Sequence, residues 1–587
     1  MAADVPPTLI DYFERNVRTN GAAIAMRFRV GTQWRDISWA DYGRAVEEIA
    51  AGLIALGVAV DDSVGVLSGN RPEWHEADLA VMRAAGRTVP VYPTNTASQT
   101  AYVLRHSGAR VCFVDGAGQA AKVLLERDTL PAVERLVIMG EDGGLDDPFV
   151  MSLEDLRELG RGLLADTPSA VAERSGDITP ETVATIVYTS GTTGPPKGTL
   201  ITHGNITATI AGITLAIHIG PEDRFLSFLP LSHIAERVVS HFGQVVSGGQ
   251  TWFAQSLATV PDDLRACRPT IFFAVPRVWQ KLRTAILADV ERSAAPIRSA
   301  VERYLTLAVE QGPRSASHER MFRVLDRVIG RSIRRQLGLD CAAVLISGAA
   351  PIAPEILSWL HGIGLPVGEV YGQTEDCGPT TLTVPGHGRI GTVGRPLPGL
   401  EVRVADDGEI LARGPSVCVG YLNDPERTAE LLDADGWMHS GDLGAFDVDG
   451  YLTITGRKKD LIVTSSGKNV APQNLETALC ASPLISQAVV VGDNRAYLTA
   501  LIALDSDEVA ALRETEGDDA VEAALRAAVE DVNRVRAPIE QIKTWRVLPH
   551  ELALEDGEIT PTLKVKRDVV AAHYRALIEE MYATEAA

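Results

Sequence analysis

The chain has 587 residues, of which 45% are hydrophobic and 22% are charged, and its formal net charge is -22. Since one hydrophobic core stops growing at ~250–300 residues, this length predicts at least two domains. The acidic balance disfavours non-specific binding to nucleic acid, which requires a basic face, and the composition excludes an extensively disordered chain.

The six cysteines show no CxxC spacing, which disfavours a disulfide framework or a structural zinc site and fits a reducing compartment. Residues 1–16 lack the basic and then apolar order of a signal peptide. The longest uncharged stretch, residues 198–221, is interrupted by polar residues and does not resemble a spanning helix. We find no amphipathic basic helix or lipidation motif. We expect a cytoplasmic protein with at most peripheral contact with the inner face of a membrane.

The first part of the chain alternates strand-like and helix-like patterns. Three short apolar runs, VGVL, TVPVY and ARVCFV, are separated by helical patterns over residues 39–56 and 72–85. This alternation predicts an α/β fold with a parallel sheet and crossover helices. Residues 165–180 are polar and rich in turn formers, so we expect a connection there, before a strand at VATIVY.

Later segments change character twice. Residues 289–335 are densely charged with apolar residues at helical spacing, which predicts long surface helices without a catalytic role. After Gly450 the strand pattern restarts at YLTITGRKKDLIV and is followed by a charged, alanine-rich helical run over residues 507–533. We therefore expect a small C-terminal domain.

The sharpest local signal follows the strand that ends at Tyr188. Gly191 and Gly194 allow the backbone to bend and present N–H groups to an anion, and Lys197 adds positive charge. The hydroxyl donors of this segment are Thr189, Ser190, Thr192 and Thr193. A plain polar hairpin is the alternative, but this density of hydroxyls, glycines and lysine favours a phosphate loop. The spacing is not that of a Walker A loop.

The segment YTSGTTGPPKG closely resembles the phosphate-loop signature of the adenylate-forming superfamily, which includes acyl-CoA synthetases, luciferases and peptide-synthetase adenylation domains. Further motifs of that superfamily follow in the expected order. They are LPLSHIAER at 229–237, ISGAAP at 346–351, GEVYGQTED at 368–376, the stretch 435–460 and a TPTLKVKR ending at 560–567. The resemblance covers nearly the whole chain.

The resemblance implies a nucleotide site. Tyr371 should stack on adenine, Thr374 and Glu375 should reach phosphate and Mg²⁺, and Asp442 should accept hydrogen bonds from the ribose hydroxyls. The metal ligand is thus expected to be Glu375. The residues expected to contact ATP or AMP are Thr189, Ser190, Gly191, Thr192, Thr193, Gly194, Lys197, Gly348, Ala349, Ala350, Glu369, Tyr371, Gly372, Gln373, Thr374, Asp442, Arg457 and Lys564.

A fatty carboxylate is already ionised at pH 7 and needs no general base, so catalysis should rest on positioning and on neutralising phosphate charge. No G-x-S-x-G serine elbow occurs in the sequence. The catalytic residues implied by the resemblance are Lys564, Thr193, Lys197, His233 and Glu375. His233 could equally be a structural histidine, because its role depends on the resemblance alone.

The resemblance also implies two domains, a large one over residues 1–457 and a small mobile α+β one over residues 458–587, with a hinge near Lys459. Rotation of the small domain would exchange Lys564 for the loop that contains Gly467 and Lys468, on the expected coenzyme A side. One site would then serve two half-reactions.

The acyl group would need an apolar site. Residues 234–254 and 270–282 are apolar and rich in small and aromatic residues, which suits either an acyl tunnel or an ordinary core. The expected acyl-site residues are His233, His241, Phe242, Val245 and Trp252. AVPRVW at 274–279 resembles long-chain and very-long-chain synthetases, and the stretch 435–460 resembles a fatty-acyl-CoA synthetase signature, from which it departs at Phe446 and Gly456.

We therefore expect an α/β enzyme that uses ATP and Mg²⁺ to convert a fatty acid, most plausibly long-chain, to acyl-AMP, and then transfers the acyl group to coenzyme A. One alternative loads the pantetheine of an acyl carrier protein, and another uses a medium-chain or other carboxylic acid. An inactive nucleotide-binding regulator is disfavoured because Lys564 and Glu375 are both present.

Overall fold

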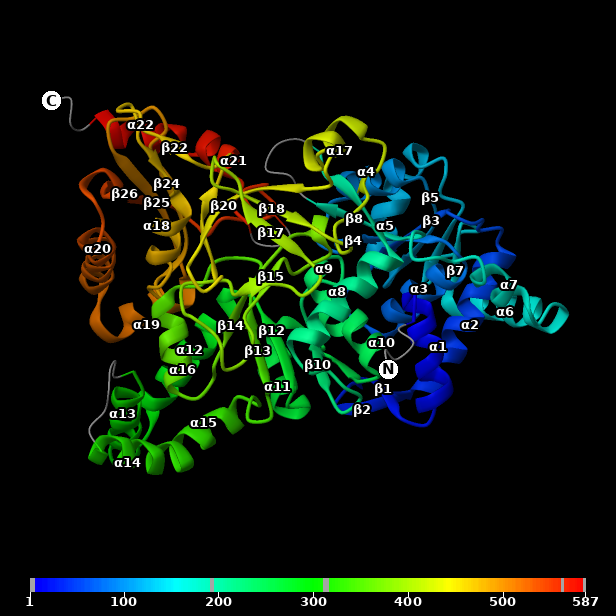
Figure 1. The fold of residues 1–587 in the computed structure, drawn as a ribbon, viewed down its shortest axis with the longest axis horizontal. Helices are drawn as coiled ribbons and strands as arrows, with labels where there is room; N and C mark the ends of the chain where they lie inside the picture. Colours follow the sequence, from blue (N-terminus) through cyan, green and yellow to red (C-terminus); the bar gives the residue numbers. More distant parts are fainter. Residues whose placement is uncertain (1–5, 190–194, 310–315, 561–563, 584–587) are drawn as a thin grey trace.

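The computed structural model describes residues 6–189, 195–309, 316–560 and 564–583 (Figure 1). Its largest sheet has eight strands in the order β19-β9-β8-β4-β3-β5-β6-β7. The strands from β8 to β7 in this order pair in parallel, and β9 pairs antiparallel with β8. Their bounds are β3 Ser63–Leu67, β4 Arg87–Val91, β5 Ala109–Val114, β6 Arg135–Ile138, β7 Val150–Ser152, β8 Val183–Thr189, β9 Lys197–Thr202 and β19 Gly420–Tyr421.

Crossover helices cover this sheet, as the alternating pattern predicts. β3 is buried along its whole length, which explains its unbroken apolar sequence. The helices of this part are α1 Leu9–Asn20, α2 Trp39–Ala55, α3 Pro72–Arg83, α4 Ala97–Ser107, α5 Ala117–Leu125, α6 Leu153–Asp166, α7 Ala170–Ser175 and α8 His203–Ala216. The expected connection over residues 165–180 contains α7, a short helix whose Val171 is fully buried in the adjacent core.

Two further sheets of the large domain adjoin where β10 contacts β12. One has the order β10-β11-β1-β2 and the other β12-β13-β14-β15-β16. Their bounds are β1 Ile24–Val30, β2 Gln33–Ser38, β10 Arg224–Ser227, β11 Gln250–Phe253, β12 Ile271–Ala274, β13 Val344–Ser347, β14 Gly368–Tyr371, β15 Thr381–Leu382 and β16 Arg395–Pro396. The connection from β10 to β11 holds α9 Ile234–Glu236, the π-helical η2 Arg237–Phe242 and α10 Gly243–Ser247.

An antiparallel sheet completes the large domain, in the order β17-β18-β20-β21. Its strands are β17 Glu401–Val404, β18 Glu409–Arg413, β20 Met438–Phe446 and β21 Leu452–Arg457. The helices of the second half of the large domain are α11 Val260–Cys267, α12 Pro276–Arg292, α13 Ala295–Val309, α14 Ala316–Leu325, the π-helical η4 Asp326–Gly330, α15 Arg331–Gln336, α16 Pro354–Gly362 and α17 Pro425–Leu431. Long helices over residues 289–335 are therefore confirmed.

The C-terminal part has its own hydrophobic core and forms a smaller α+β unit. Its elements are β22 Ile462–Val463, β23 Asn469–Val470, α18 Pro472–Leu479, β24 Ile485–Val491, β25 Leu498–Leu504, α19 Ser506–Glu516, α20 Asp518–Arg534, β26 Ile542–Val547, α21 Arg567–His573 and α22 Arg575–Ala583. Gly517 divides the expected 507–533 helix into α19 and α20. The large α/β and small α+β organisation is confirmed.

Contacts between the two units involve α12. Gln280 donates to the carbonyl of Cys480 at 3.1 Å, and Arg277 pairs with Asp505 at the start of α19. All six cysteines are free thiols in the structure. Among the described helices, none is long and apolar enough to cross a bilayer.

Candidate active site

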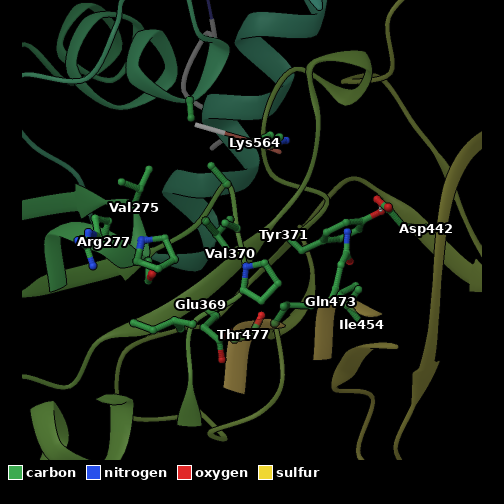
Figure 2. Close-up of a pocket in the computed structure, with 18 of the residues that line it drawn as sticks. Val275, Arg277, Glu369, Val370, Tyr371, Asp442, Ile454, Gln473, Thr477 and Lys564 are labelled. Carbon is green, nitrogen blue, oxygen red and sulfur yellow. Dashed lines mark hydrogen bonds between the residues drawn. The ribbon is translucent and has the colours of Figure 1, made fainter. Parts of the chain in front are cut away.

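A cavity of about 2000 Å³ lies between the large domain and the small C-terminal unit. Most of the residues expected at the nucleotide line it, from β14, β20 and β21 of the large domain and from the segment around Lys564. Figure 2 shows side chains from both parts of the chain around one space, with Tyr371 pointing toward Asp442. The cavity therefore unites motifs from Thr189 to Lys564, which are 375 residues apart in sequence.

Tyr371, Asp442 and Arg457 form one polar group at the carboxyl end of β14. The Tyr371 hydroxyl donates to Asp442 Oδ2 at 2.9 Å, and Arg457 Nε lies 2.8 Å from Asp442 Oδ1. Asp442 and Arg457 are direct partners in the β20–β21 ladder, so strand register fixes the ion pair. An aromatic ring beside a carboxylate suits a purine nucleoside, whose hydroxyls can donate to that carboxylate.

Lys197 and Glu375 are joined through Tyr421, which the motif comparison did not identify. Lys197 Nζ donates to the Tyr421 hydroxyl at 3.1 Å, and this hydroxyl donates to Glu375 Oε1 at 2.8 Å. The ammonium also lies 4.3 Å from the centre of the Tyr421 ring. Burial lowers the pKa of Lys197, and the Glu375 carboxylate partly opposes this shift. Tyr421 is 224 residues from Lys197 and is held there by the pairing of β19 with β9.

Lys564 and His233 both line the cavity and interact electrostatically. Burial within its walls lowers the pKa of Lys564, and the positive charge of Arg457 lowers it further. Burial also lowers the pKa of His233 to about 4, with a further contribution from Lys564. His233 Nδ1 accepts from the backbone N–H of Ala235 at 3.2 Å, which makes His233 the N-cap of α9. The neutral imidazole therefore carries its proton on Nε2 and can act as a hydrogen-bond donor.

The loop after β13 passes close to β14. A side chain at Gly348 would meet Val370 Cγ1 at 2.4 Å, so only glycine allows this approach. Ala349 adopts a left-handed backbone with φ of 68° and lines the cavity together with Ala350, whereas Gly348 does not. Gly372 similarly leaves no room for a side chain, since a Cβ there would lie 1.6 Å from the Gly378 carbonyl oxygen.

Glu369 lies on the same strand, two residues before Tyr371, and also lines the cavity. Burial raises the pKa of its carboxyl to about 8, although a hydrogen bond from the backbone of Gly391 opposes this. At pH 7 the side chain is therefore mainly a neutral carboxylic acid.

The phosphate loop is described only at its ends. Thr189 and Lys197 line the cavity, while the predicted contacts Ser190, Gly191, Thr192, Thr193 and Gly194 lie outside the described residues. Gln373, Thr374 and Glu375 also line the cavity. Glu375 is 7% exposed, and its Oε1 is occupied by the hydroxyl of Tyr421, which leaves Oε2 as a hard oxygen donor of the kind that Mg²⁺ prefers.

One branch of the cavity is apolar. His233 lines the cavity, but His241, Phe242, Val245 and Trp252 do not. His241 is fully buried. Its Nε2 lies 2.9 Å from Asp78, which also forms an ion pair with the buried Arg237. The other three pack into hydrophobic cores. The apolar walls are formed instead by Ile210, Ile213, Ile217, Phe225, Ala235, Val238, Val239, Gly243, Phe273 and Leu382.

The period of these wall residues explains why the sequence pattern was misleading. Ala235, Val238, Val239 and Gly243 recur at spacings of three and four residues, so one helical face meets the cavity while His241 and Phe242 point into the protein. Polar residues of this segment, namely Glu236, Arg237, Ser240 and His241, are buried as well, so polarity in the sequence does not distinguish the two faces.

The residues expected on the coenzyme A side do not line the cavity in this arrangement. Gly467 and Lys468 are exposed in the turn between β22 and β23 and do not line the cavity. Lys459, the expected hinge, does line it. The observed arrangement thus presents the Lys564 segment to the nucleotide side chains. The domain boundary and the hinge remain predictions.

This fold and site define a nucleotide-binding enzyme whose cavity is shared by a large and a small domain. Residues 13–422 match the AMP-binding enzyme family, and residues 459–586 match the AMP-binding enzyme C-terminal domain. The chain belongs to the AMP-binding enzyme family, as the resemblance predicted.

Relatives with known names agree with this assignment. The chain is 36% identical to the long-chain-fatty-acid–CoA ligase FadD15 of Mycobacterium bovis, over 94% of this chain and 93% of the relative. It is 32% identical to the long-chain-fatty-acid–CoA ligase ACSBG2 of Xenopus laevis, over 99% of this chain and 84% of the relative.

Solved structures share the fold. The anthranilate CoA ligase AuaEII in complex with anthranoyl-AMP matches with a TM-score of 0.75 at 19% identity, over 98% of this chain and 99% of that chain. The adenylation domain of the carboxylic acid reductase from Segniliparus rugosus, in complex with AMP and a co-purified carboxylic acid, matches with a TM-score of 0.75 at 21% identity, over 98% and 94%.

Proposed function

We propose that this enzyme uses ATP to activate a fatty acid as acyl-AMP and then transfers the acyl group to coenzyme A. The observation that carries the proposal is one cavity with a polar end around Tyr371, Asp442 and Lys564 and an apolar branch along α8 and α9–α10. A fatty acid has the same two chemical parts, a carboxylate and a hydrocarbon chain. The names of the relatives support coenzyme A as acceptor and a long-chain fatty acid as substrate.

The nucleotide would lie at the polar end. The Tyr371 ring would stack on adenine against the loop at Ala349 and Ala350, and Asp442 would accept from the ribose hydroxyls. Arg457 holds the Asp442 carboxylate in place through their 2.8 Å ion pair. These residues bind the part of ATP that is unchanged by the reaction, which fixes the position of the α-phosphate.

The phosphates would be met by local cations in an otherwise acidic protein. Lys197, Lys564 and the phosphate loop supply donors, and Glu375 offers an oxygen to Mg²⁺, which neutralises phosphate charge when bound. Tyr421 keeps Lys197 and Glu375 at a fixed separation. His233, neutral at pH 7, would donate a hydrogen bond from Nε2 to an oxygen of the substrate.

The first half-reaction needs no general base. A carboxylate oxygen of the fatty acid attacks the α-phosphorus, the bond to the β-phosphate oxygen breaks, and pyrophosphate leaves. Lys564 stabilises the negative charge on the carboxylate and α-phosphate during this step. In the second half-reaction the thiol sulfur of coenzyme A attacks the acyl carbonyl, the bond from the acyl carbon to the phosphate oxygen breaks, AMP leaves, and the thiol proton is released to solvent.

The second half-reaction requires the thiol to reach a site that the Lys564 segment now faces. Rotation of residues 458–587 about Lys459 would withdraw Lys564 and bring the exposed turn with Gly467 and Lys468 toward the acyl group. This movement would give the small domain one role in each half-reaction.

The proposal is tested by ATP–pyrophosphate exchange with saturated acids of graded chain length, followed by mass analysis of the product with coenzyme A or with a pantetheinylated carrier protein. We expect exchange that depends on a long-chain acid and an acyl-CoA product. Exchange that is independent of any fatty acid would contradict the substrate class, and acyl transfer to the carrier protein alone would contradict the acceptor.

A further inference from the structure

A helical run over residues 316–336 forms one outer corner of the large domain. It consists of α14, η4 and α15 and lies beside α13 at the lower left of Figure 1, far from α1–α7. Neither the nucleotide site nor the acyl branch uses this run, since none of its described residues lines the cavity.

The inner side of the run is firmly attached to the protein. Leu325, Ile329 and Ile333 pack against the hydrophobic core that contains Trp279 and Leu360. Asp326 accepts from the Tyr304 hydroxyl at 2.8 Å and from Arg334, which also donates to the carbonyl of Ile363. At Gly330 the helix approaches Tyr304 so closely that a side chain would lie 2.3 Å from its hydroxyl. The opposite side is therefore held outward on a fixed support.

That opposite side is an almost continuous row of arginine and valine, which we name the arginine face. Its members recur at spacings of three and four residues and therefore share one side of the helix. They are Arg320, Arg323, Val324, Arg327, Val328, Arg331 and Arg335, all exposed.

The charge of this face is opposite to that of the protein. Residues 320–336 contain six arginines and one acidic residue, Asp326, whereas the whole chain has 55 basic and 77 acidic residues. Asp326 is on the inner side and pairs with Arg334, and Glu319 at the start of the run pairs with Arg323. The arginine face thus presents concentrated positive charge on a protein of net charge -22.

Two exposed apolar side chains lie between the arginines of the arginine face. Val324 is 65% exposed and Val328 is 68% exposed, one helical turn apart. A face made only to increase solubility has no need of exposed valines between arginines, whereas a membrane surface binds both, through anionic headgroups and the adjacent hydrocarbon.

We propose that the arginine face docks this enzyme on the surface of an anionic lipid bilayer. The helix lies flat and its backbone remains attached to the large domain, so the contact is peripheral. The run therefore forms an amphipathic basic helix, contrary to the sequence expectation: its apolar residues, which recur at helical spacing, point into the protein, and its arginines point outward.

Docking on a membrane would suit the proposed function, because the proposed fatty-acid substrate partitions into membranes. α13 packs on α12 and α16, and residues of α12, including Arg277 and Gln280, line the cavity. Docking through the arginine face would therefore hold the α12 side of the cavity near the lipid that contains the acid.

The test measures binding of the full-length protein to vesicles without ATP or fatty acid, so its result does not depend on the enzymatic activity. Vesicles of phosphatidylcholine alone are compared with vesicles that also contain phosphatidylglycerol, by flotation at low and at physiological salt. We expect binding to the anionic vesicles only, and weaker binding as salt rises.

The variant Arg327→Glu, Arg331→Glu, Arg335→Glu should reduce this binding at least about tenfold, because three cations near the headgroups become anions. The matched control is Arg513→Glu, Arg526→Glu, Arg534→Glu, which makes the same change in net charge on exposed helices of the C-terminal unit. A second variant, Val324→Ser with Val328→Ser, should weaken binding without changing charge. Thermal unfolding of each variant checks that folding is retained.

Several results would overturn the proposal. They are equal binding to neutral and anionic vesicles, an equal loss in the control triple variant, and no vesicle binding at all. If the arginine triple variant instead abolished self-association in sedimentation, or bound a polynucleotide less well while vesicle binding was unchanged, the face would serve a second copy of the chain or another polyanion.

Discussion

Asp442 and Arg457 are direct partners across strands β20 and β21, and their side chains form an ion pair of 2.8 Å at the polar end of the cavity. Asp442 is 4% exposed, and it also accepts from Tyr371. The ion pair therefore links two strands, and it also holds the Asp442 carboxylate that is proposed to bind ribose.

Asp442→Asn should raise the KM for ATP about tenfold, because hydrogen bonds to a charged acceptor contribute roughly 1.5–3 kcal/mol. Tyr371→Phe removes the hydroxyl but keeps the ring, and should have a smaller effect. Steady-state kinetics at varied ATP and saturating acid would measure both. An unchanged KM for ATP in the Asp442 variant would remove Asp442 from the nucleotide site.

Tyr421→Phe breaks the connection between Lys197 and Glu375 without removing either charge. We expect the rate of ATP–pyrophosphate exchange to fall about ten- to hundredfold, since both hydrogen bonds of the hydroxyl involve charged groups. The phenyl ring remains to fill the space, so the melting temperature should change little. A large loss of stability at unchanged exchange rate would indicate a purely structural role.

Glu369 gives a prediction about pH. Burial holds its pKa at about 8, so the carboxyl is neutral below that pH and becomes negative above it. The negative form is unfavourable both for folding and for binding of an anionic nucleotide, so the KM for ATP should rise above pH 8. Glu369→Gln stays neutral and should show no such rise. Parallel KM–pH profiles in the two proteins would argue against this assignment.

The acyl branch can be shortened by substitution. Val239 lies on the helical face that lines the cavity, and Val239→Trp would fill part of the apolar space. We expect the preference among saturated acids to move to shorter chains by at least tenfold in kcat/KM, at unchanged KM for ATP. Equal loss with all chain lengths would show that the substitution disturbs the fold and does not define chain length.

Local motifs allowed much of this site to be predicted from the sequence. Tyr371, Thr374 and Glu375 lie within five residues of one another, and Asp442 meets Arg457 through the short hairpin of β20 and β21, so sequence neighbours carry the geometry. The alternation of β3, β4 and β5 with α2 and α3 likewise follows from local patterns.

Long-range contacts could not be predicted in the same way. His241 is directed inward by Asp78, which is 163 residues away, and Tyr421 reaches Lys197 through the pairing of β19 with β9. Each of these features depends on tertiary packing that a single sequence does not display.

The division of labour between the two half-reactions is the central claim, and Lys564→Ala tests it most directly. Acyl-AMP formation from ATP and acid is measured separately from thioester formation with supplied acyl-AMP and coenzyme A. Lys564 is proposed to stabilise charge only while the carboxylate attacks the α-phosphorus, so the first rate should fall by at least about a thousandfold while the second stays within about threefold of wild type. Equal loss of both half-reactions would contradict the account.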